Sequence, residues 1–233
     1  MYTPVTLGNK VWDDHIGNGF QNKGEPGMVG VLVTLLDVNV DAVMDAATGQ
    51  AVVTITAADG SYWFTNLAPG EYGVQFALPP GFLFAPAPGD LPGDSMPDGS
   101  FPDIAADITL HDNLGVTSTQ ALTSGENNTS FDAGIYIPVI VGGMVWDDSN
   151  ANGIKEEGEE PLDGATITVF NSLFGFSDPN PSFVSSNSDR EYTMSLPPGT
   201  YFGIISAPSP DYILSSMAPK EEANGSNFDH DTM

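Results

Sequence analysis

The chain has no cysteine, and only 5 of its 233 residues are lysine or arginine, against 31 aspartates and glutamates. Without cysteine there are no disulfides, no thiolate metal sites and no cysteine nucleophile. The formal net charge of −26 excludes a nucleic-acid binder, which must neutralise phosphates, and argues against binding to an anionic membrane surface. A cation held by carboxylates is therefore the one kind of internal staple that the composition favours.

Long hydrophobic runs and strong helix signals are also missing. The longest apolar stretch, residues 135–141, is too short for a membrane span and contains Pro138. No signal peptide is visible, so if the protein is exported we expect its leader to lie outside this chain. Residues 40–49 could form one or two helical turns. The 26 glycines and 19 prolines at short spacing are instead typical of an all-β sandwich.

Residues 148–159 (loop 2), DSNANGIKEEGE, match the calcium-loop template D-x-[DN]-x-[DN]-G-x5-E at every fixed position. A hard divalent cation such as Ca2+ takes about six to eight oxygen ligands. The loop offers the side-chain oxygens of Asp148, Asn150, Asn152 and Glu159 and the main-chain carbonyl of Ile154. We therefore predict a calcium site here. Because extracellular modules use calcium structurally, the loop favours a secreted or cell-surface protein.

Residues 14–25 (loop 1), DHIGNGFQNKGE, are an altered copy of the same loop. The copy keeps Asp14, Asn18 and Glu25 as side-chain ligands and the carbonyl of Phe20. The third position is Ile16, which has no oxygen to offer. This loop therefore binds calcium more weakly, recruits a ligand or water from elsewhere, or is a turn that keeps its shape without metal.

The two loops belong to an internal repeat. Residues 2–14 (YTPVTLGNKVWDD) and 136–148 (YIPVIVGGMVWDD) align without a gap and end in the same V-W-D-D. We predict two β-sandwich domains, residues 1–137 and 138–233. After each loop the pattern predicts an alternating strand and then two strands joined by a Pro-Gly turn, in residues 25–37 and 59–76 of the first repeat and 160–170 and 189–205 of the second.

The first repeat is longer than the second. Past a Pro/Gly/Asp-rich loop at residues 79–102, it continues to two strands near residues 117–122 and 129–137, and the second repeat has nothing to match them. We therefore expect the second sandwich to lack its last strands. Either the chain is a piece of a longer array, or a neighbouring subunit supplies the strands by β-strand addition.

Five blocks in sequence order, LGNKVWDD, the acidic loop, EPGMVGVLVTL, DGSYWFTNLAPGEY with PPGF, and LTSGENNTSFDAGIY, resemble the SdrD B-like domains (Sdr-type B repeats) of bacterial surface adhesins, which are related to Cna B-type domains. The resemblance covers nearly all of both repeats. It implies tandem Greek-key β-sandwiches of the prealbumin or immunoglobulin-like kind, with calcium in the loop after the first strand. It also implies a stalk or spacer role outside the cell and no enzymatic activity.

Some Cna B-type relatives carry an isopeptide bond from a lysine to an asparagine or aspartate. Lys10 and Asp132 would be the pair in the first repeat, and Met144 replaces the lysine in the second. We do not expect the bond. The histidines show no cluster spacing, and no nucleophile elbow, paired catalytic motif or phosphate loop appears, which agrees with a non-enzyme.

Aromatic residues offer a rival function. Trp12 and Trp146 end a strand before each loop, where we expect packing rather than carbohydrate stacking. Trp63 falls on the face opposite Tyr62 and Phe64 and is a candidate contact with a neighbour. The insert at residues 171–183 adds Phe174, Phe176 and Phe183. These residues would serve an adhesin or a module that binds a glycan or a surface protein, and a third alternative is a spacer of a larger secreted protein.

Further aspartates precede strands or crowd the long loop of the first repeat. They either complete additional calcium sites or cap solvated turns, and for any one of them the turn is favoured. These residues are Asp59, Asp94, Asp103, Asp107, Asp112 and Asp189.

Overall fold

The computed structural model of the chain describes residues 1–85, 109–111, 114–172, 182–186 and 192–215. These residues form strands and turns and contain no helix, which confirms the all-β prediction. Nothing within the described residues forms an apolar helix of membrane-spanning length. Residues 40–49 form no helical turn of the kind considered above, and β-bridges from Leu36 to Ala42 and from Met44 to Ala51 flank a turn instead.

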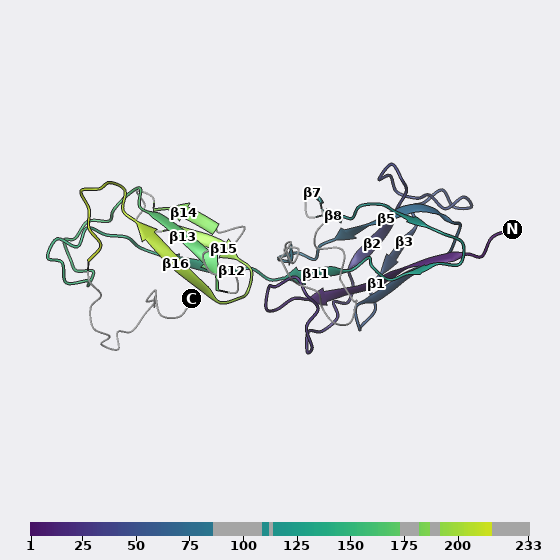
Figure 1. Ribbon diagram of the computed structural model, residues 1–233, viewed down its shortest axis with the longest axis horizontal. Helices are drawn as coiled ribbons and strands as arrows, with labels where there is room; N and C mark the ends of the chain where they lie inside the picture. The colour runs from purple at the N-terminus through teal and green to yellow at the C-terminus, as the bar shows by residue number, and fades with distance from the viewer. Residues whose placement is uncertain (86–108, 112–113, 173–181, 187–191, 216–233) are drawn as a thin grey trace. The chain divides into compact units, whose positions relative to one another are not determined.

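The chain divides into two compact units, Met1–Pro138 (unit 1) and Val139–Met233 (unit 2). Figure 1 labels strands of both units. The strands of unit 1 are β1 (Val5–Asp13), β2 (Leu32–Leu36), β3 (Val53–Ile55), β4 (Ser61–Leu67), β5 (Gly70–Ala77), β6 (Leu83–Phe84), β7 (Thr109–His111), β8 (Leu114–Val116), β9 (Gln120–Leu122), β10 (Asn127–Asn128) and β11 (Ala133–Tyr136).

Unit 1 contains two sheets. In the first, β1 pairs with β4 along one edge and with β10 and β11 along the other, and β6 extends the sheet beyond β11. The second has the order β3-β2-β5-β8-β7, with β9 also on β5. The strands β4 and β5, which the Pro-Gly turn connects, do not form a hairpin, because β4 pairs with β1 and β5 with β2. The turn therefore carries the chain from one sheet to the other.

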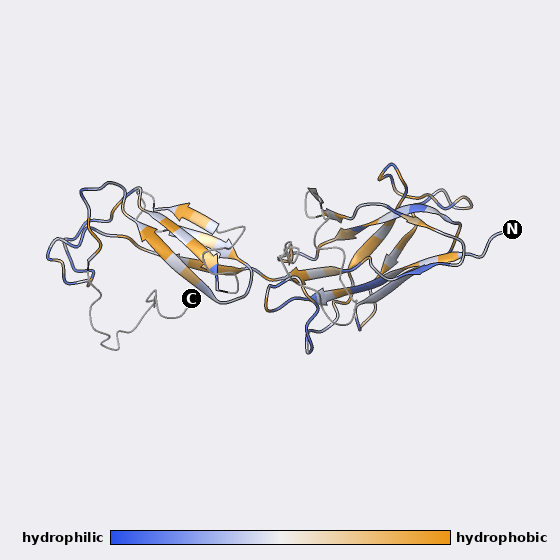
Figure 2. Cartoon of the chain, in the orientation of Figure 1, coloured by the Kyte–Doolittle hydropathy of each residue, from blue (hydrophilic) through white to orange (hydrophobic). Residues whose placement is uncertain are grey.

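The core of unit 1 lies between these sheets. Alternate residues of β1, β4 and β11 face alternate residues of β2 and β5, as period-two strands require. Tyr62 and Phe64 of β4 are buried, and the ring of Tyr62 meets Phe76 of β5 edge to face at 5.7 Å. Figure 2 shows orange on the strands and blue in the loops that follow β1 and β12.

The described residues of unit 2 repeat part of this plan with fewer strands. Its strands are β12 (Val139–Gly143), β13 (Thr166–Asn171), β14 (Ser182–Ser185), β15 (Tyr192–Leu196) and β16 (Tyr201–Ser206). The strands β12 and β15 pair as β1 and β4 do, and the order β14-β13-β16 matches β3-β2-β5. A smaller core contains Ile167, Val169, Tyr192, Leu196 and Tyr201.

The two units differ at the edge of the strand that leads into the loop. In unit 1 the strands β10 and β11 run parallel to β1 along this edge. Among the described residues of unit 2, no strand pairs with the corresponding edge of β12. The second sandwich, as far as the structure describes it, is open on this side.

Candidate metal centres

Loops 1 and 2 follow β1 and the extension of β12, and they share one backbone arrangement. In loop 1 the backbone N–H of Gly17 donates to the carbonyl of Asp14 at 3.1 Å. In loop 2 the N–H of Ala151 donates to the carbonyl of Asp148, also at 3.1 Å. A β-bridge closes each loop, between Trp12 and Gly27 in unit 1 and between Trp146 and Pro161 in unit 2. The repeated sequence thus folds the same way twice.

The first carboxylate of each loop orders the turn behind it. Asp14 accepts backbone N–H groups from Asn18 at 3.2 Å and from Gly19 at 2.6 Å. Asp148 accepts from Asn152 at 3.1 Å and from Gly153 at 2.7 Å. Glycine is required at the second of these positions because Gly19 and Gly153 have φ values of 77° and 76°.

In the last carboxylate of each loop, one oxygen accepts a hydrogen bond and the other does not. Glu25 Oε2 accepts the N–H of Asn22 at 2.7 Å, and Glu159 Oε2 accepts the N–H of Glu156 at 3.0 Å. The other oxygens, Glu25 Oε1 and Glu159 Oε1, are buried and have no hydrogen-bond partner. A buried carboxylate oxygen without a partner is costly, so each of these two atoms is suited to an ion.

The oxygens of both loops are of the kind that calcium takes. No three carboxylate or imidazole side chains of the described residues converge on one point, so each loop has two carboxylates to offer and would complete a coordination shell with amide and carbonyl oxygens. In loop 1 the residues that would hold Ca2+ are Asp14, Asn18, Phe20 and Glu25, and in loop 2 they are Asp148, Asn150, Asn152, Ile154 and Glu159.

Loop 1 has the more buried first carboxylate, whereas the last carboxylates, Glu25 and Glu159, are buried to the same extent. Asp14 is fully buried and Glu25 is 7% exposed. Burial, together with the nearby charge of Asp14, raises the pKa of Glu25 above its ordinary value. The imidazole of His15 lies 3.9 Å from Glu25 Oε1, with its own side chain half exposed. Ile16, the residue that breaks the template, is 42% exposed. Two buried acids that repel each other are the electrostatic setting that a divalent cation relieves.

Loop 2 is more open to solvent, although its template is complete. Asp148 is partly exposed, and hydrogen bonds from Ser215 and from the backbone of Gly153 lower its pKa. The side-chain amides of Asn150 and Asn152 donate to the carboxylate of Glu156. Their Oδ1 atoms accept backbone N–H groups within the loop.

Lys155 is a cation supplied by loop 2 itself. Its Nζ donates to the carbonyl of Glu159 at 2.6 Å and to that of Glu156 at 2.9 Å. The residue at the same position of loop 1, Gln21, carries no charge. Loop 2 is therefore partly neutralised without a metal ion. Loop 1 has a lysine too, Lys23, but its side chain is exposed, and the basic group beside the buried Glu25 is His15.

The other aspartates that were candidates for additional calcium sites lie either in a turn or outside the described residues. Asp59 Oδ1 accepts the backbone N–H of Ser61 at 3.0 Å and its hydroxyl at 2.6 Å, and these bonds lower the pKa of Asp59. Asp59 thus caps a turn before β4, as favoured above. The remaining candidates, Asp94, Asp103, Asp107, Asp112 and Asp189, lie outside the described residues.

Asp132 bonds to the backbone of Lys10. Its Oδ1 accepts the Lys10 N–H at 2.8 Å, and its Oδ2 accepts the side-chain amide of Asn9 at 2.9 Å. Burial raises the pKa of Asp132 to about 7, against these hydrogen bonds. The pair considered for an isopeptide bond thus forms a polar link between β1 and the segment that enters β11, a role that the sequence did not reveal.

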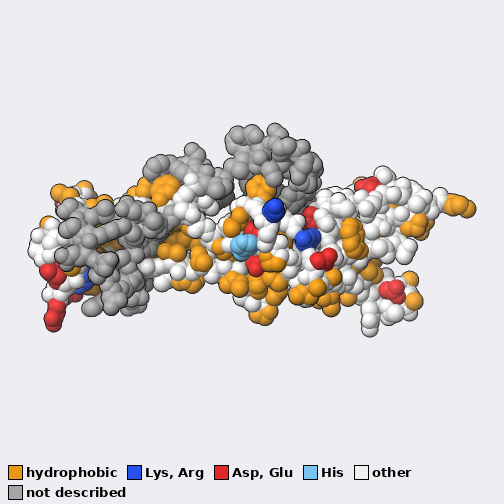
Figure 3. Space-filling model, turned by 90° about the horizontal axis from the view of Figure 1, so that it is seen from below, with side chains coloured by type: hydrophobic (Ala, Val, Ile, Leu, Met, Phe, Trp, Pro, Cys, Tyr) orange, Lys and Arg blue, Asp and Glu red, His pale blue; other side chains and the backbone are white. Residues whose placement is uncertain are grey.

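The aromatic candidates separate by exposure. Trp12 is 1% exposed and Trp146 is partly buried, which agrees with packing beside the loops. Trp63 is 42% exposed, and Phe183 of β14 is 76% exposed. Figure 3 shows groups of hydrophobic side chains on the face that it presents, with few charged ones between them. Phe174 and Phe176 lie outside the described residues.

Comparison with known families assigns the first unit to a domain family. The family model of the SdrD B-like domain matches residues 5–135. Serine-aspartate repeat-containing protein D of Staphylococcus aureus (strain Newman) is 30% identical over 224 residues, which cover 94% of this chain and 15% of that protein. Serine-aspartate repeat-containing protein F of Staphylococcus epidermidis is 32% identical over 168 residues, 71% of this chain and 9% of that protein. The chain thus spans a small part of these relatives.

Solved structures with distant similarity include two pilins. The Streptococcal ancillary pilin has a TM-score of 0.33 and 17% identity, over 95% of this chain and 60% of that one. The shaft pilin spaA from Lactobacillus rhamnosus GG has a TM-score of 0.26 and 10% identity, over 91% of this chain and 89% of that one. These TM-scores are too low to carry a functional assignment.

Proposed function

The chain belongs to the SdrD B-like domain family, and on this premise we propose that it is a non-enzymatic structural protein of the cell exterior. Its units are calcium-stabilised β-sandwiches that act as stalk or filament segments. The observation that carries the proposal is a pair of buried oxygens, Glu25 Oε1 and Glu159 Oε1, which lack a hydrogen-bond partner at the same place in two repeated loops.

Calcium in these loops would tie the end of one strand to the start of the next. The first ligand, Asp14 or Asp148, directly follows the repeated V-W-D residues, and the last, Glu25 or Glu159, directly precedes the segment that bridges back to the tryptophan. An ion held by both ends closes the loop and adds the binding free energy of the ion to the stability of the unit. Rigid units in tandem are what a stalk requires.

Thermal melting in calcium and in excess chelator tests this proposal. Because calcium would bind the folded state, a free concentration about a thousand times Kd adds roughly 4 kcal/mol, so the chelator should lower the melting temperature by several degrees or more. Magnesium at the same concentration is the control, since its octahedral preference suits the loops poorly. An unchanged melt in chelator contradicts the proposal.

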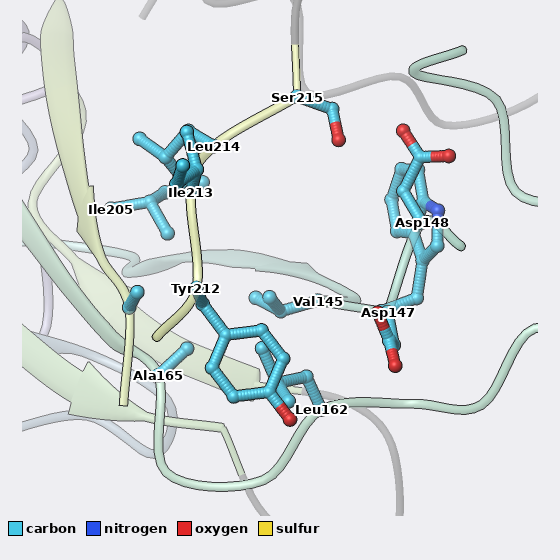
Figure 4. A pocket seen from close by; sticks show the side chains of 12 residues that line it. Val145, Asp147, Asp148, Leu162, Ala165, Ile205, Tyr212, Ile213, Leu214 and Ser215 are labelled. Carbon is cyan, nitrogen blue, oxygen red and sulfur yellow. The ribbon is translucent and has the colours of Figure 1, made fainter. Parts of the chain in front are cut away.

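The open side of unit 2 favours assembly by strand addition. Beside the strand that enters loop 2 lies a cavity of about 90 Å³, lined by Val145, Trp146, Leu162, Ile205 and Tyr212 among others. Figure 4 shows Asp148 at the right of this pocket and Ser215 above it, with Ile205, Ile213 and Leu214 at the left. We propose that the terminal strand of a neighbouring subunit pairs with this edge.

Sedimentation velocity over a range of concentrations tests strand addition. Assembly should grow with concentration, and removal of residues 1–4, which are exposed and precede β1, should reduce it. A deletion that reached residue 7 would also remove Val5 and Leu7, which are fully buried in the core of unit 1. A protein that stays monomeric at high concentration in calcium would contradict assembly between copies and leave the calcium sites unaffected.

Exposed aromatic residues support a second candidate function, a module that binds a glycan or a surface protein. Trp63 projects from β4 with 42% of its surface exposed, whereas its neighbours Tyr62 and Phe64 are buried. An indole face of this kind can stack on a sugar or an apolar side chain. Glycan and protein binding screens with Trp63→Ala as the control would separate this role from a purely structural one.

A further inference from the structure

Loop 1 is held from outside by β11. The backbone N–H of Asp14 donates to the carbonyl of Ile135 at 2.8 Å. In the parallel ladder between β1 and β11, Trp12 is the partner of Gly134 and Asp13 is the partner of Ile135. The first calcium ligand of unit 1 is therefore fixed by a strand from the far end of the unit's sequence.

Gly134 makes this contact sterically specific. A Cβ atom at Gly134 would lie 2.8 Å from Trp12 Cζ2, 3.0 Å from Trp12 Cε2 and 3.2 Å from Ala85 Cβ. Real Cβ atoms do not approach that closely, so a side chain here would push β11 away from Trp12. The absence of a side chain lets β11 lie directly over the indole and reach Asp14.

Loop 2 has no such contact among the described residues. No described strand of unit 2 lies along the corresponding edge of β12, and the residue that bonds to the Asp148 carboxylate from outside the loop is Ser215, in a segment with no secondary structure. Asp148 and Trp146 accordingly keep more exposed surface than Asp14 and Trp12.

We propose that β11 is part of the first calcium site. Gly134 and Ile135 act as positioning residues for Asp14, so the calcium affinity of loop 1 depends on β11, whereas loop 2 binds with its own residues. This inference rests on the proposed calcium sites. It also accounts for a loop that lacks its third ligand: a ligand already fixed before binding loses less conformational freedom when the ion arrives, which offsets part of the missing oxygen.

The test is a calcium titration of the full chain by isothermal calorimetry. Asp148→Asn removes the calcium site of loop 2 (site 2), and Asp14→Asn removes that of loop 1 (site 1). Each variant therefore gives the affinity of the site that remains. Gly134→Ala is then added to each. We expect the affinity of site 1 to fall about tenfold, within the usual range of coupling between sites, and that of site 2 to change less than twofold. Site 2 thus serves as an internal control in the same molecule.

Two further variants separate positioning from general destabilisation. Gly73→Ala places a Cβ 3.3 Å from the carbonyls of Thr117 and Ser118, which strains β5 without touching β11 or loop 1. It should leave site 1 unchanged. If Gly134→Ala fails to fold, the double variant Trp12→Phe with Gly134→Ala removes the clashing indole atoms. This double variant should fold, and its site 1 should bind calcium nearly as tightly as site 1 of the Trp12→Phe variant.

The outcomes distinguish the two proposals. If the wild-type chain takes up no calcium, both fail. If it binds calcium, and a folded Gly134→Ala variant, verified by near-ultraviolet circular dichroism, keeps the site 1 affinity within twofold, then the loop acts alone and only the role of β11 is overturned.

Discussion

Loop 1 and loop 2 share their backbone hydrogen bonds and differ in what lies beside them. Loop 1 has a fully buried Asp14 that bonds to β11, whereas loop 2 has a partly exposed Asp148 next to Ser215 and a lysine, Lys155, that bonds to carbonyls of the loop. A loop motif therefore specifies the turn and buries its last carboxylate, while the strand beside it decides how deeply the first carboxylate is buried. A buried carboxylate gains more from a nearby cation than an exposed one does.

The largest expected effect comes from the last ligand of each loop. Glu25→Gln removes a buried charge whose Oε1 has no partner, so unit 1 should lose its calcium-dependent stabilisation, roughly 4 kcal/mol at a thousandfold excess over Kd. In chelator the same variant should be more stable than wild type, because desolvation and Asp14 both disfavour the Glu25 carboxylate. Glu159→Gln is the matched variant in unit 2. Hydrogen exchange measured by mass spectrometry resolves the two units, and equal effects in both would break the comparison.

The two tryptophans give the next effect. Trp12 is 1% exposed under Gly134, and Trp146 is only partly buried beside the pocket. Trp12→Ala should cost unit 1 about 3–5 kcal/mol, and Trp146→Ala should cost unit 2 about half as much. Neither indole N–H has a hydrogen-bond partner, so the loss is one of packing alone. Urea unfolding of each variant, followed by a unit-resolved probe, would show whether the order is reversed.

The stability of unit 1 should depend on pH in a way that the stability of unit 2 does not. Burial raises the pKa of Asp132 from 3.8 to about 7, so the folded unit binds a proton that the unfolded chain has released. Its contribution is therefore favourable below about pH 4, falls as the pH rises to about 7 and is constant above it. A shift of this size corresponds to a decline of about 4 kcal/mol, which Asp132→Asn should remove. Unit 2 has Gly143 and Met144 in place of Asn9 and Lys10 and should lack this component. Denaturant midpoints measured from pH 4 to pH 8 check the slope, and a slope that Asp132→Asn leaves unchanged would contradict the assignment.

The smallest effect concerns the third loop position. Ile16→Asp supplies the missing oxygen in loop 1 and should tighten site 1 by about tenfold, or roughly 1.4 kcal/mol. Asn150→Ile removes the corresponding oxygen from loop 2 and should weaken site 2 by at least as much, because no strand among the described residues bonds to Asp148 as β11 bonds to Asp14. Calorimetric titration of both variants compares the sites directly. The loss of one amide ligand can be compared in loop 1 by replacing Asn18. If that replacement lowers the calcium affinity of site 1 more than Asn150→Ile lowers that of site 2, β11 does not hold Asp14 in place for the ion.

Much of the fold could be predicted from the sequence. The V-W-D-D repeats place β1 and the extension of β12, the alternation around Trp63 assigns the faces of β4, and glycine and proline spacing gives an all-β chain. The pairing of β4 with β1 and of β5 with β2 could not be predicted, because alternation within a strand does not identify its partner.

The relative burial of the carboxylates in the two loops was harder to predict than the loops themselves. Ile16 makes loop 1 look defective, and a template records which residue stands at each position but not its exposure. The buried Asp14 bonds to Ile135, beside Gly134, and these residues are close to the loop only in the folded unit. The signal that could have pointed to them is the glycine in FDAGIY, which had no counterpart to align with in the second repeat.

The most direct test of calcium in the loops is a crystal structure determined from crystals grown in calcium, with anomalous difference density used to locate the ions. We expect one peak within bonding distance of Glu25 Oε1 and another beside Glu159 Oε1. Density for water alone at both oxygens, under calcium concentrations that saturate binding in solution, would contradict the account.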